Sequence, residues 1–180
     1  RAQLFASASE SELEGLADAD LARLADLDFA TFAIRPAGTH RLHVGAGEGE
    51  AGHRHMAVVL NTDDMPFLVD SATAAIGAQG LEIRRLIHPI LAVRRDAAGR
   101  VTRLGNPEDP RESLILMDVD RAPARKRAAL ARQLDLVYGD VRNAVGDWQL
   151  MLTELRGAAR ALNDNPPLRD PATFRLIGRP

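Results

Sequence analysis

The sequence contains no cysteine, which excludes disulfide bonds and thiolate metal sites from these 180 residues. Aromatic residues make up only 4% of the chain, so the core must be built from Leu, Val, Ile and Ala. Neither sign of charge predominates, because the formal net charge is −2. Nothing electrostatic therefore points to a nucleic acid or an anionic membrane surface as a partner. No apolar run approaches the ~20 residues of a membrane-spanning helix.

What is present is the composition of a globular chain, with 46% hydrophobic residues. The length suits one domain with a small extension. The chain begins at Arg1 and shows no signal-peptide pattern. We therefore expect a piece of a longer cytoplasmic protein.

Helical signals open and close the sequence. Ser9 and Glu12 have the spacing of a capping box, and leucines at three-residue steps follow, which predicts two short helices within residues 9–33. Near the other end, apolar residues recur at steps of three and four from Leu130 to Leu155, which predicts one long helix over about residues 124–162. We expect an N-terminal helical segment (1–38), an α+β domain (39–162) and a tail or linker (163–180).

The middle of the chain alternates strand and helix patterns. We first expect a strand at 40–44, a Gly-rich loop at 45–52 and a strand at 56–60, followed by a helix that begins at Asp63 or Asp64 and ends at Gly80. After the helix we expect a strand at 81–95 that Pro89 interrupts. A turn at 96–99 and strands at 101–104 and 113–119 complete this part. Phe67, Leu68, Ala72, Ala75 and Ile76 form the apolar stripe of that helix.

This order of elements is most of the split βαβ, ferredoxin-like plan, in which two helices cover one face of an antiparallel sheet. The sequence shows no evident pattern for a final strand after the long helix. We expect the upstream strand at 40–44 to fill its position in the sheet, giving an α+β variant of the plan. Fold alone assigns no function.

Several short motifs resemble, in the same order, the N-terminal part of the large bacterial NAD-specific glutamate dehydrogenases. They are Asp63-Asp-Met-Pro-Phe-Leu-Val-Asp-Ser71, His88-Pro89, Arg94-Arg95-Asp96, Glu112-Ser113, Asp140-Val-Arg142 and Asp147-Trp148. The resemblance covers roughly residues 4 to 155. Gly146 stands where the pattern has Glu before Asp147-Trp148.

The resemblance implies an N-terminal ACT-like domain, which is a regulatory and assembly module. The parent enzyme would convert L-glutamate, NAD and water to 2-oxoglutarate, ammonia and NADH. Its nucleotide-binding domain would lie far downstream, and this chain has no Gly-x-Gly-x-x-Gly after a strand. We therefore expect no catalytic, cofactor-binding or metal-binding residue here. We expect a homo-oligomer in contact with the rest of the polypeptide.

The adjacent carboxylates Asp63 and Asp64 raise three alternatives. A catalytic acid–base pair is disfavoured, because nothing in the sequence indicates a cleft or a substrate position. Capping of the following helix is favoured, since both carboxylates would lie at the positive end of its dipole. The third alternative comes from the resemblance, because ACT-like domains bind small amino acids at this turn. The effector contacts would then be Asn61, Thr62, Asp63, Asp64 and Met65. Two acids at the turn suit a neutral or cationic effector better than an anionic one.

Other polar clusters favour structural interpretations. His53 and His55 could begin a metal site with Asp63 or Asp64, but a solvated pair is favoured. His88, beside Pro89, is interpreted as a hydrogen-bonded structural histidine at a bulge.

Two features of the long helix are interpreted in the same way. The basic cluster Arg121, Arg125, Lys126, Arg127 and Arg132 is interpreted as a solvated helix face, because no aromatic platform for bases accompanies it. Trp148 is interpreted as a core or interface residue. The far end of the stripe would pack on a neighbouring helix or domain, with the N-terminal leucine helices as candidates.

Three functions remain open at this point. The first is a regulatory or assembly domain of a glutamate dehydrogenase, and the second is a purely structural packing module of the same enzyme. The third is an independent amino-acid-binding protein of ACT type.

Overall fold

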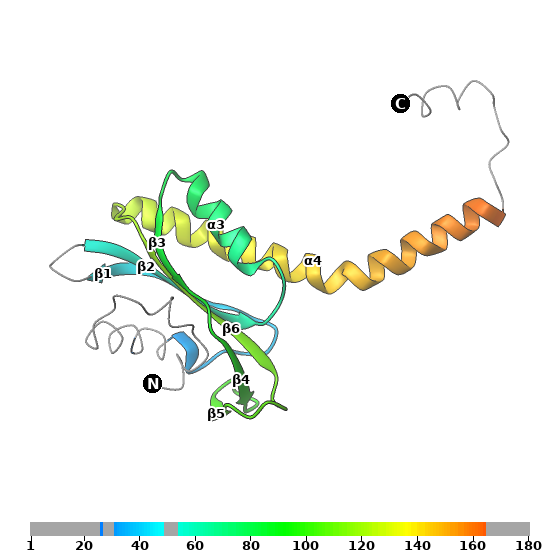
Figure 1. The fold of residues 1–180 in the computed structure, drawn as a ribbon, viewed down its shortest axis with the longest axis horizontal. Helices are drawn as coiled ribbons and strands as arrows, with labels where there is room; N and C mark the ends of the chain where they lie inside the picture. Colours follow the sequence, from blue (N-terminus) through cyan, green and yellow to red (C-terminus); the bar gives the residue numbers. More distant parts are fainter. Residues whose placement is uncertain (1–25, 27–30, 49–53, 165–180) are drawn as a thin grey trace, which may run out of the picture. The chain divides into compact units, whose positions relative to one another are not determined.

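The computed structural model describes residue 26 and residues 31–48 and 54–164 (Figure 1). The elements are β1 (Arg41–Glu48), β2 (Arg54–Asp63), α3 (Leu68–Ala78), β3 (Ile83–Ile87), β4 (Ile90–Arg95), β5 (Val101–Leu104), β6 (Arg111–Val119) and α4 (Ala124–Asp164). The chain divides into two units, Arg1–Arg142 and Asn143–Pro180. The helices predicted within 9–33 and the tail at 163–180 fall almost entirely outside the described residues.

The strands form one six-stranded antiparallel sheet in the order β1-β2-β6-β4-β5, with β3 also paired to β6. This confirms the α+β, ACT-like prediction. The upstream strand fills the predicted sheet position, since β1 pairs with β2 from Arg41 opposite Asn61 to Glu48 opposite Arg54. It runs further than predicted, into residues assigned to a loop, because pairing with β2 satisfies the backbone of its glycine-rich end.

Pro89 interrupts the predicted long strand as expected. β3 pairs with one half of β6 and β4 with the other, for example Ile87 opposite Leu116 and Ile90 opposite Ser113. Pro89 lies between them and has no N–H to donate. Its carbonyl oxygen still accepts a hydrogen bond from the Leu114 N–H at 3.0 Å. β3 and β4 therefore pair in succession along the same side of β6.

Helix α3 ends at the predicted glycine. Gly80 adopts the left-handed conformation with φ of 63°, which costs glycine nothing. Its N–H bonds to the Gly77 carbonyl oxygen at 2.8 Å, and the Leu81 N–H bonds to that of Ile76 at 3.4 Å. These two bonds make a Schellman motif. Burial of Ile76 and Leu81 supplies the apolar contact that accompanies it.

Helix α3 and the first part of α4 lie on the same face of the sheet (Figure 1). The side-chain amide nitrogen of Gln79 donates to the side-chain oxygen Oε1 of Gln133 at 2.7 Å, which joins the two helices. Their buried side chains are Leu68, Ala72, Ala75 and Ile76 on α3 and Leu130, Leu134, Tyr138 and Val141 on α4. Alternation along β2 and β6 directs Met56, Val58, Leu60, Ile115, Met117 and Val119 toward this layer.

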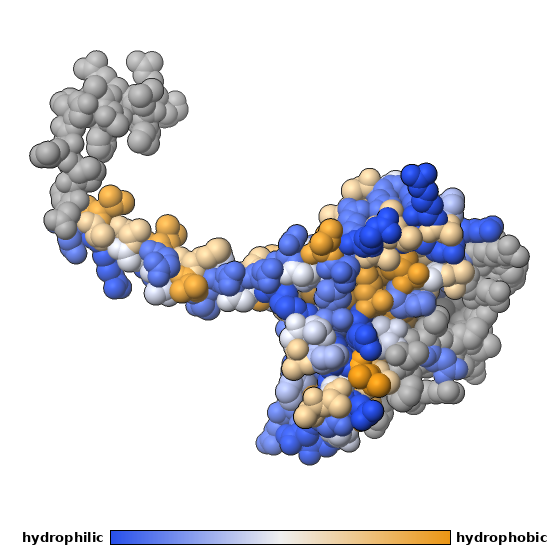
Figure 2. All heavy atoms as spheres, turned by 180° about the vertical axis from the view of Figure 1, so that it is seen from behind, coloured by the Kyte–Doolittle hydropathy of each residue, from blue (hydrophilic) through white to orange (hydrophobic). Residues whose placement is uncertain are grey.

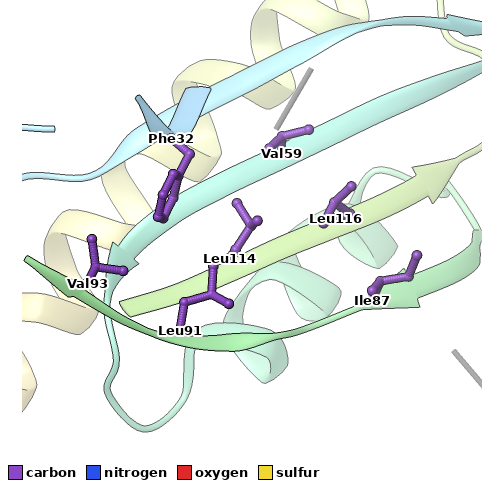
Figure 3. Packing of buried hydrophobic residues seen from close by; sticks show 7 residues of the cluster. All are labelled: Phe32, Val59, Ile87, Leu91, Val93, Leu114 and Leu116. Atoms are coloured by element: carbon purple, nitrogen blue, oxygen red, sulfur yellow. The ribbon is translucent and has the colours of Figure 1, made fainter. Parts of the chain in front are cut away.

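The opposite face of the sheet has its own buried cluster (Figure 3). It consists of Phe32, Val59, Ile87, Leu91, Val93, Leu114 and Leu116, with Val101 and Leu104 packed against it. Both faces of β2 and β6 are therefore buried. This is why their sequences are continuously apolar instead of alternating.

The predicted long helix is confirmed, since α4 runs from Ala124 to Asp164. Most of its apolar residues beyond Val141 are exposed, while Val145 and Leu152 are partly exposed. Hydrophobic side chains alternate with hydrophilic ones along this part (Figure 2). Trp148 is 53% exposed, so its interpretation as a core residue is wrong, and its role at an interface stays a prediction. Within the described residues, no helix combines the length and the apolar character that crossing a bilayer requires.

Candidate functional site

Asp63 and Asp64 do not cap helix α3. Strand β2 runs to Asp63, which pairs with Glu112 of β6, and the Asp64 N–H still bonds to the Arg111 carbonyl oxygen at 3.1 Å. The helix starts only at Leu68, and no side chain bonds to its free amides. The capping prediction is therefore wrong. The sheet register holds both residues in extended structure, and this long-range pairing overrides a local sequence pattern.

Phe67 also departs from the prediction. It precedes the helix, with φ of 70°, and its side chain is 64% exposed instead of joining the apolar stripe. A left-handed conformation is unusual for a bulky residue. The turn between β2 and α3 thus carries a strained, solvent-exposed aromatic residue.

The Asp63 carboxylate lies between two guanidinium groups from distant parts of the chain. Its Oδ1 lies 2.6 Å from Nη2 of Arg35, in the segment before β1. Its Oδ2 lies 3.0 Å from Nη1 of Arg142, on α4. Asp63 is half exposed while Arg35 is buried. The carboxylate therefore joins three segments of the chain at the end of the central strand.

Beneath Asp63 lies a buried ion pair centred on Glu112, whose side chain is 2% exposed. Arg95 donates to both Glu112 oxygens, from Nε at 2.7 Å and from Nη2 at 2.8 Å. Arg35 Nη2 lies 2.8 Å from Oε1. Burial acts to raise the pKa of Glu112, but hydrogen bonds from Arg95, Arg35 and Asn61 outweigh it and hold that pKa below its usual value. Glu112 is therefore a fixed anion.

The Arg95 guanidinium organises the surrounding backbone as well. It donates to the carbonyl oxygens of Gly99 at 2.8 Å and Phe32 at 2.9 Å. Its central carbon lies 4.9 Å from the centre of the Phe32 ring, a cation–π contact. Burial acts to lower the pKa of Arg35, yet its bonds to Glu112 and Asp63 raise that pKa overall. Arg35 therefore keeps its positive charge despite its burial.

Asn61 and Thr62, the first two predicted effector contacts, are buried and already bonded. The Asn61 amide donates to Glu112 Oε2 at 3.0 Å and accepts from Arg95 Nη2 at 3.1 Å. Thr62 Oγ1 accepts from Arg142 Nη2 at 2.8 Å. Of the five predicted residues, those with exposed or partly exposed side chains are Asp63, Asp64 and Met65.

Asp64 belongs to a second chain of hydrogen bonds. The buried Ser113 hydroxyl donates to Asp64 Oδ1 at 2.8 Å, and Nε2 of His88 lies 3.0 Å from the same hydroxyl oxygen. His88 is thus the hydrogen-bonded histidine beside Pro89 that the sequence predicts. The buried hydroxyl donates to the carboxylate and not to the imidazole, so this is not the geometry of an activated serine nucleophile.

The arginines around the turn face two of its carboxylates. Arg35, Arg95 and Arg142 lie against Asp63 and Glu112, whereas Asp64 accepts a hydrogen bond from the Ser113 hydroxyl. The preference for a cationic effector assumed that Asp63 is a free acid, and the structure shows it paired with two guanidinium groups. The sequence did contain a signal for two of the arginines, since Arg95 and Arg142 belong to the motifs quoted above. No pattern linked any of the three to Asp63.

Of the predicted histidine pair, His53 lies outside the described residues. The His55 side chain is only 16% exposed and its Nε2 lies 3.6 Å from Asp118 Oδ1, so the interpretation of His55 as solvated is wrong. No group of three or more potential metal ligands occurs in the described part of the chain.

The basic cluster at the start of α4 has the exposure expected of a solvated face. Arg121, Arg125 and Arg132 are exposed, and Lys126 and Arg127 are partly exposed. Arg127 also donates to the Ala122 carbonyl oxygen at 3.0 Å, which closes the first turn of the helix.

The sequence profile of the ACT1 domain of glutamate dehydrogenase matches residues 1–134. The chain belongs to this family. The matched range contains β1 to β6. It also contains every residue of the ion-pair network described above except Arg142.

Two curated relatives carry the same stretch. The NAD-specific glutamate dehydrogenase of Halomonas elongata is 36% identical over 129 residues, which is 67% of this chain and 8% of that protein. The NAD-specific glutamate dehydrogenase of Pseudomonas aeruginosa is 33% identical over 108 residues, which is 57% of this chain and 7% of that protein. The aligned part therefore spans less than a tenth of the length of either relative.

Proposed function

We propose that this chain is the regulatory and assembly domain of a cytoplasmic, homo-oligomeric NAD-dependent glutamate dehydrogenase. The whole polypeptide would oxidise L-glutamate with NAD and water to 2-oxoglutarate, ammonia and NADH. The observation that carries the proposal is the ACT1-domain match over residues 1–134, together with relatives that are both NAD-specific glutamate dehydrogenases. The ACT-like sheet and its two covering helices support it.

The regulatory part of the proposal places a small amino acid at the turn formed by Asn61, Thr62, Asp63, Asp64 and Met65. A zwitterion could exchange with the Asp63–Arg142 ion pair, its ammonium group contacting Asp63 and its carboxylate contacting Arg142. The half-exposed Asp63 side chain and the partly exposed Arg142 side chain support this, since they are the accessible ionic groups of the network. Asn61 and Thr62 would then act by holding the two charged residues in place.

A purely structural packing module is the second candidate, and one observation favours it. Every polar side chain among Asn61, Thr62, Asp63 and Asp64 already has a protein partner. A ligand must therefore replace existing hydrogen bonds within the protein. Each charge-assisted bond that is replaced reduces the net free energy of ligand binding.

The deciding experiment uses the full-length enzyme that contains this domain. Its NAD-dependent oxidation of L-glutamate tests the catalytic part. Thermal shifts with the twenty amino acids, 2-oxoglutarate and NAD test the regulatory part. A ligand at a hundred times its Kd stabilises the folded state by about 2.7 kcal/mol.

The matched variants are Asp63→Asn and Asp64→Asn, which remove charge without removing volume. A shift with one amino acid that disappears in Asp63→Asn establishes the turn as an effector site. If no amino acid shifts the melting temperature, while Asp63→Asn lowers it, the packing module is correct. Absence of glutamate oxidation would contradict the assignment of the whole enzyme.

A further inference from the structure

The second half of α4 carries a broad apolar surface, which we call the C-terminal apolar face. It consists of Ala144, Val145, Trp148, Met151, Leu152, Leu155, Ala158, Ala159 and Leu162. All of these residues lie in the unit that begins at Asn143. Most of its large side chains are open to solvent: Trp148 is 53% exposed, Leu155 67% and Leu162 59%, whereas Val145 and Leu152 are partly exposed. Contiguous exposed apolar patches of this kind usually mark interaction surfaces.

The spacing of these residues gives the shape of the face. Trp148, Leu155 and Leu162 recur at seven-residue intervals and form its centre line. One side of that line holds Val145, Leu152 and Ala159, and the other holds Ala144, Met151 and Ala158. Three apolar positions in every seven is the width of a helix packed inside a bundle. A two-stranded coiled coil uses a narrower seam with two.

The margins of the face argue against a second copy of the same helix. One margin carries Asp147 and Glu154, and the other carries Gln149 and Arg156. Antiparallel pairing of two copies would bring the acidic margin of one against the acidic margin of the other. A parallel pair normally has charged residues beside its seam, where this helix has Ala144, Met151 and Ala158.

We propose that the C-terminal apolar face packs against helices of the same polypeptide that lie outside residues 1–180, completing a helical bundle. The curated relatives are long enough to supply such helices, because this stretch is 7–8% of their length. Charge complementarity defines the partner: an amphipathic helix with Lys or Arg beside Asp147 and Glu154. The small Ala144 and Ala158 allow the backbone of such a helix to approach closely. Helix α4 thereby connects the ACT-like sheet to the remainder of the enzyme.

A cysteine-protection experiment on the full-length polypeptide tests this contact. Leu155→Cys places a thiol at the centre of the face. The matched control is Leu150→Cys, because Leu150 is 62% exposed and lies about 140° around the helix from Leu155. Both positions fall between Arg142 and Arg156, so the same tryptic peptide, 143–156, reports both labelling rates by mass spectrometry. Labelling in denaturant gives the intrinsic reactivity of each thiol.

We expect the Leu155→Cys thiol to react at least about tenfold more slowly than the Leu150→Cys thiol in the folded enzyme. The protection should not depend on protein concentration, because the partner belongs to the same chain. Equal labelling rates would overturn the proposal. Protection that is lost on dilution would also overturn it, because the partner would then be another copy.

A measurement on the unmodified enzyme guards against a variant that fails to fold. Hydroxyl-radical footprinting reports on Trp148 and Met151 directly, and both are about half exposed in this chain. In the full-length enzyme we expect both to be oxidised at least about tenfold more slowly than after denaturation. Oxidation of both at the denatured rate would show that nothing covers the face.

Discussion

Asp63 accepts a guanidinium group on each of its two oxygens, from Arg35 at 2.6 Å and from Arg142 at 3.0 Å. Arg35 is 28 residues away in the sequence and Arg142 is 79 residues away. Arg142 is also the last residue of the first unit. This carboxylate therefore ties the first part of helix α4 to the end of β2.

Replacing Asp63 by Asn should lower the free energy of unfolding by about 1–2 kcal/mol. The change removes two charge-assisted bonds but keeps the volume, and the half-exposed carboxylate is partly screened by water, which limits the loss. Chemical denaturation of the wild type and the variant measures the difference. A variant as stable as the wild type would show that the two ion pairs of Asp63 contribute nothing to the free energy of unfolding.

Glu112→Gln should cost more, about 3–5 kcal/mol. Glu112 is almost fully buried, so neutralising its carboxylate removes the counter-charge of the nearly buried Arg95 and one of the two carboxylates that face the buried Arg35. The same denaturation measurement gives the comparison with Asp63→Asn. A smaller loss for Glu112→Gln than for Asp63→Asn would contradict the ranking by burial.

The free energy of unfolding should decrease on acidification below about pH 5. There, carboxylates whose pKa is lowered by folding bind fewer protons in the folded state than in the unfolded state. Hydrogen bonds from Arg103 and Arg94 lower the pKa of Asp109 from 3.8 to about 2. Its contribution is therefore complete above the unfolded pKa and is lost as the pH falls from about 4 to 2. Glu112, with its lowered pKa, acts in the same direction.

Asp109→Asn should make the stability less dependent on pH between 4 and 2, as measured by thermal melting across a pH series. Asp118→Asn is the control, because burial raises the pKa of Asp118 and its protonation does not oppose folding. An unchanged acid dependence in Asp109→Asn, or its loss in Asp118→Asn, would contradict this role of the Asp109 carboxylate.

Gly99→Ala should be strongly destabilising, by more than about 2 kcal/mol. Gly99 has φ of 77°, and a Cβ there would lie 2.4 Å from the Arg35 carbonyl oxygen. Gly80→Ala is the matched control, since Gly80 has φ of 63° with nothing within 4 Å of the added carbon. Its cost should be only the conformational one, about 1 kcal/mol. Equal decreases in melting temperature for the two variants would mean that the backbone at Arg35 shifts to accommodate the added Cβ.

Phe67→Gly should stabilise the domain by about 0.5–1 kcal/mol. The left-handed backbone at Phe67 costs a non-glycine residue about 1–2 kcal/mol, and the greater freedom of glycine in the unfolded chain offsets part of this. Little burial is lost, because the ring is 64% exposed. Loss of stability in a denaturant titration would show that the ring makes stabilising contacts.

Local patterns in the sequence were sufficient to predict most elements. Apolar residues at steps of three and four predicted α4, and the apolar runs predicted β2 and β6. Pro89 predicted the break between β3 and β4, and Gly80 predicted the end of α3. The short motifs gave the family, which the ACT1-domain match confirms. These features depend on neighbouring residues, whose spacing and backbone preferences are visible in the sequence.

The role of Asp63 was decided only by the tertiary structure. Its local context, an acid followed by Pro66, is typical of a helix start, yet β2 continues through it because Glu112 pairs opposite. The arginines that neutralise it come from positions before β1 and on α4. Such partners are set by sheet register and helix placement, which no local pattern encodes. Burial of Glu112 between Arg35 and Arg95 then fixes its charge, because a desolvated carboxylate stays ionised only when paired.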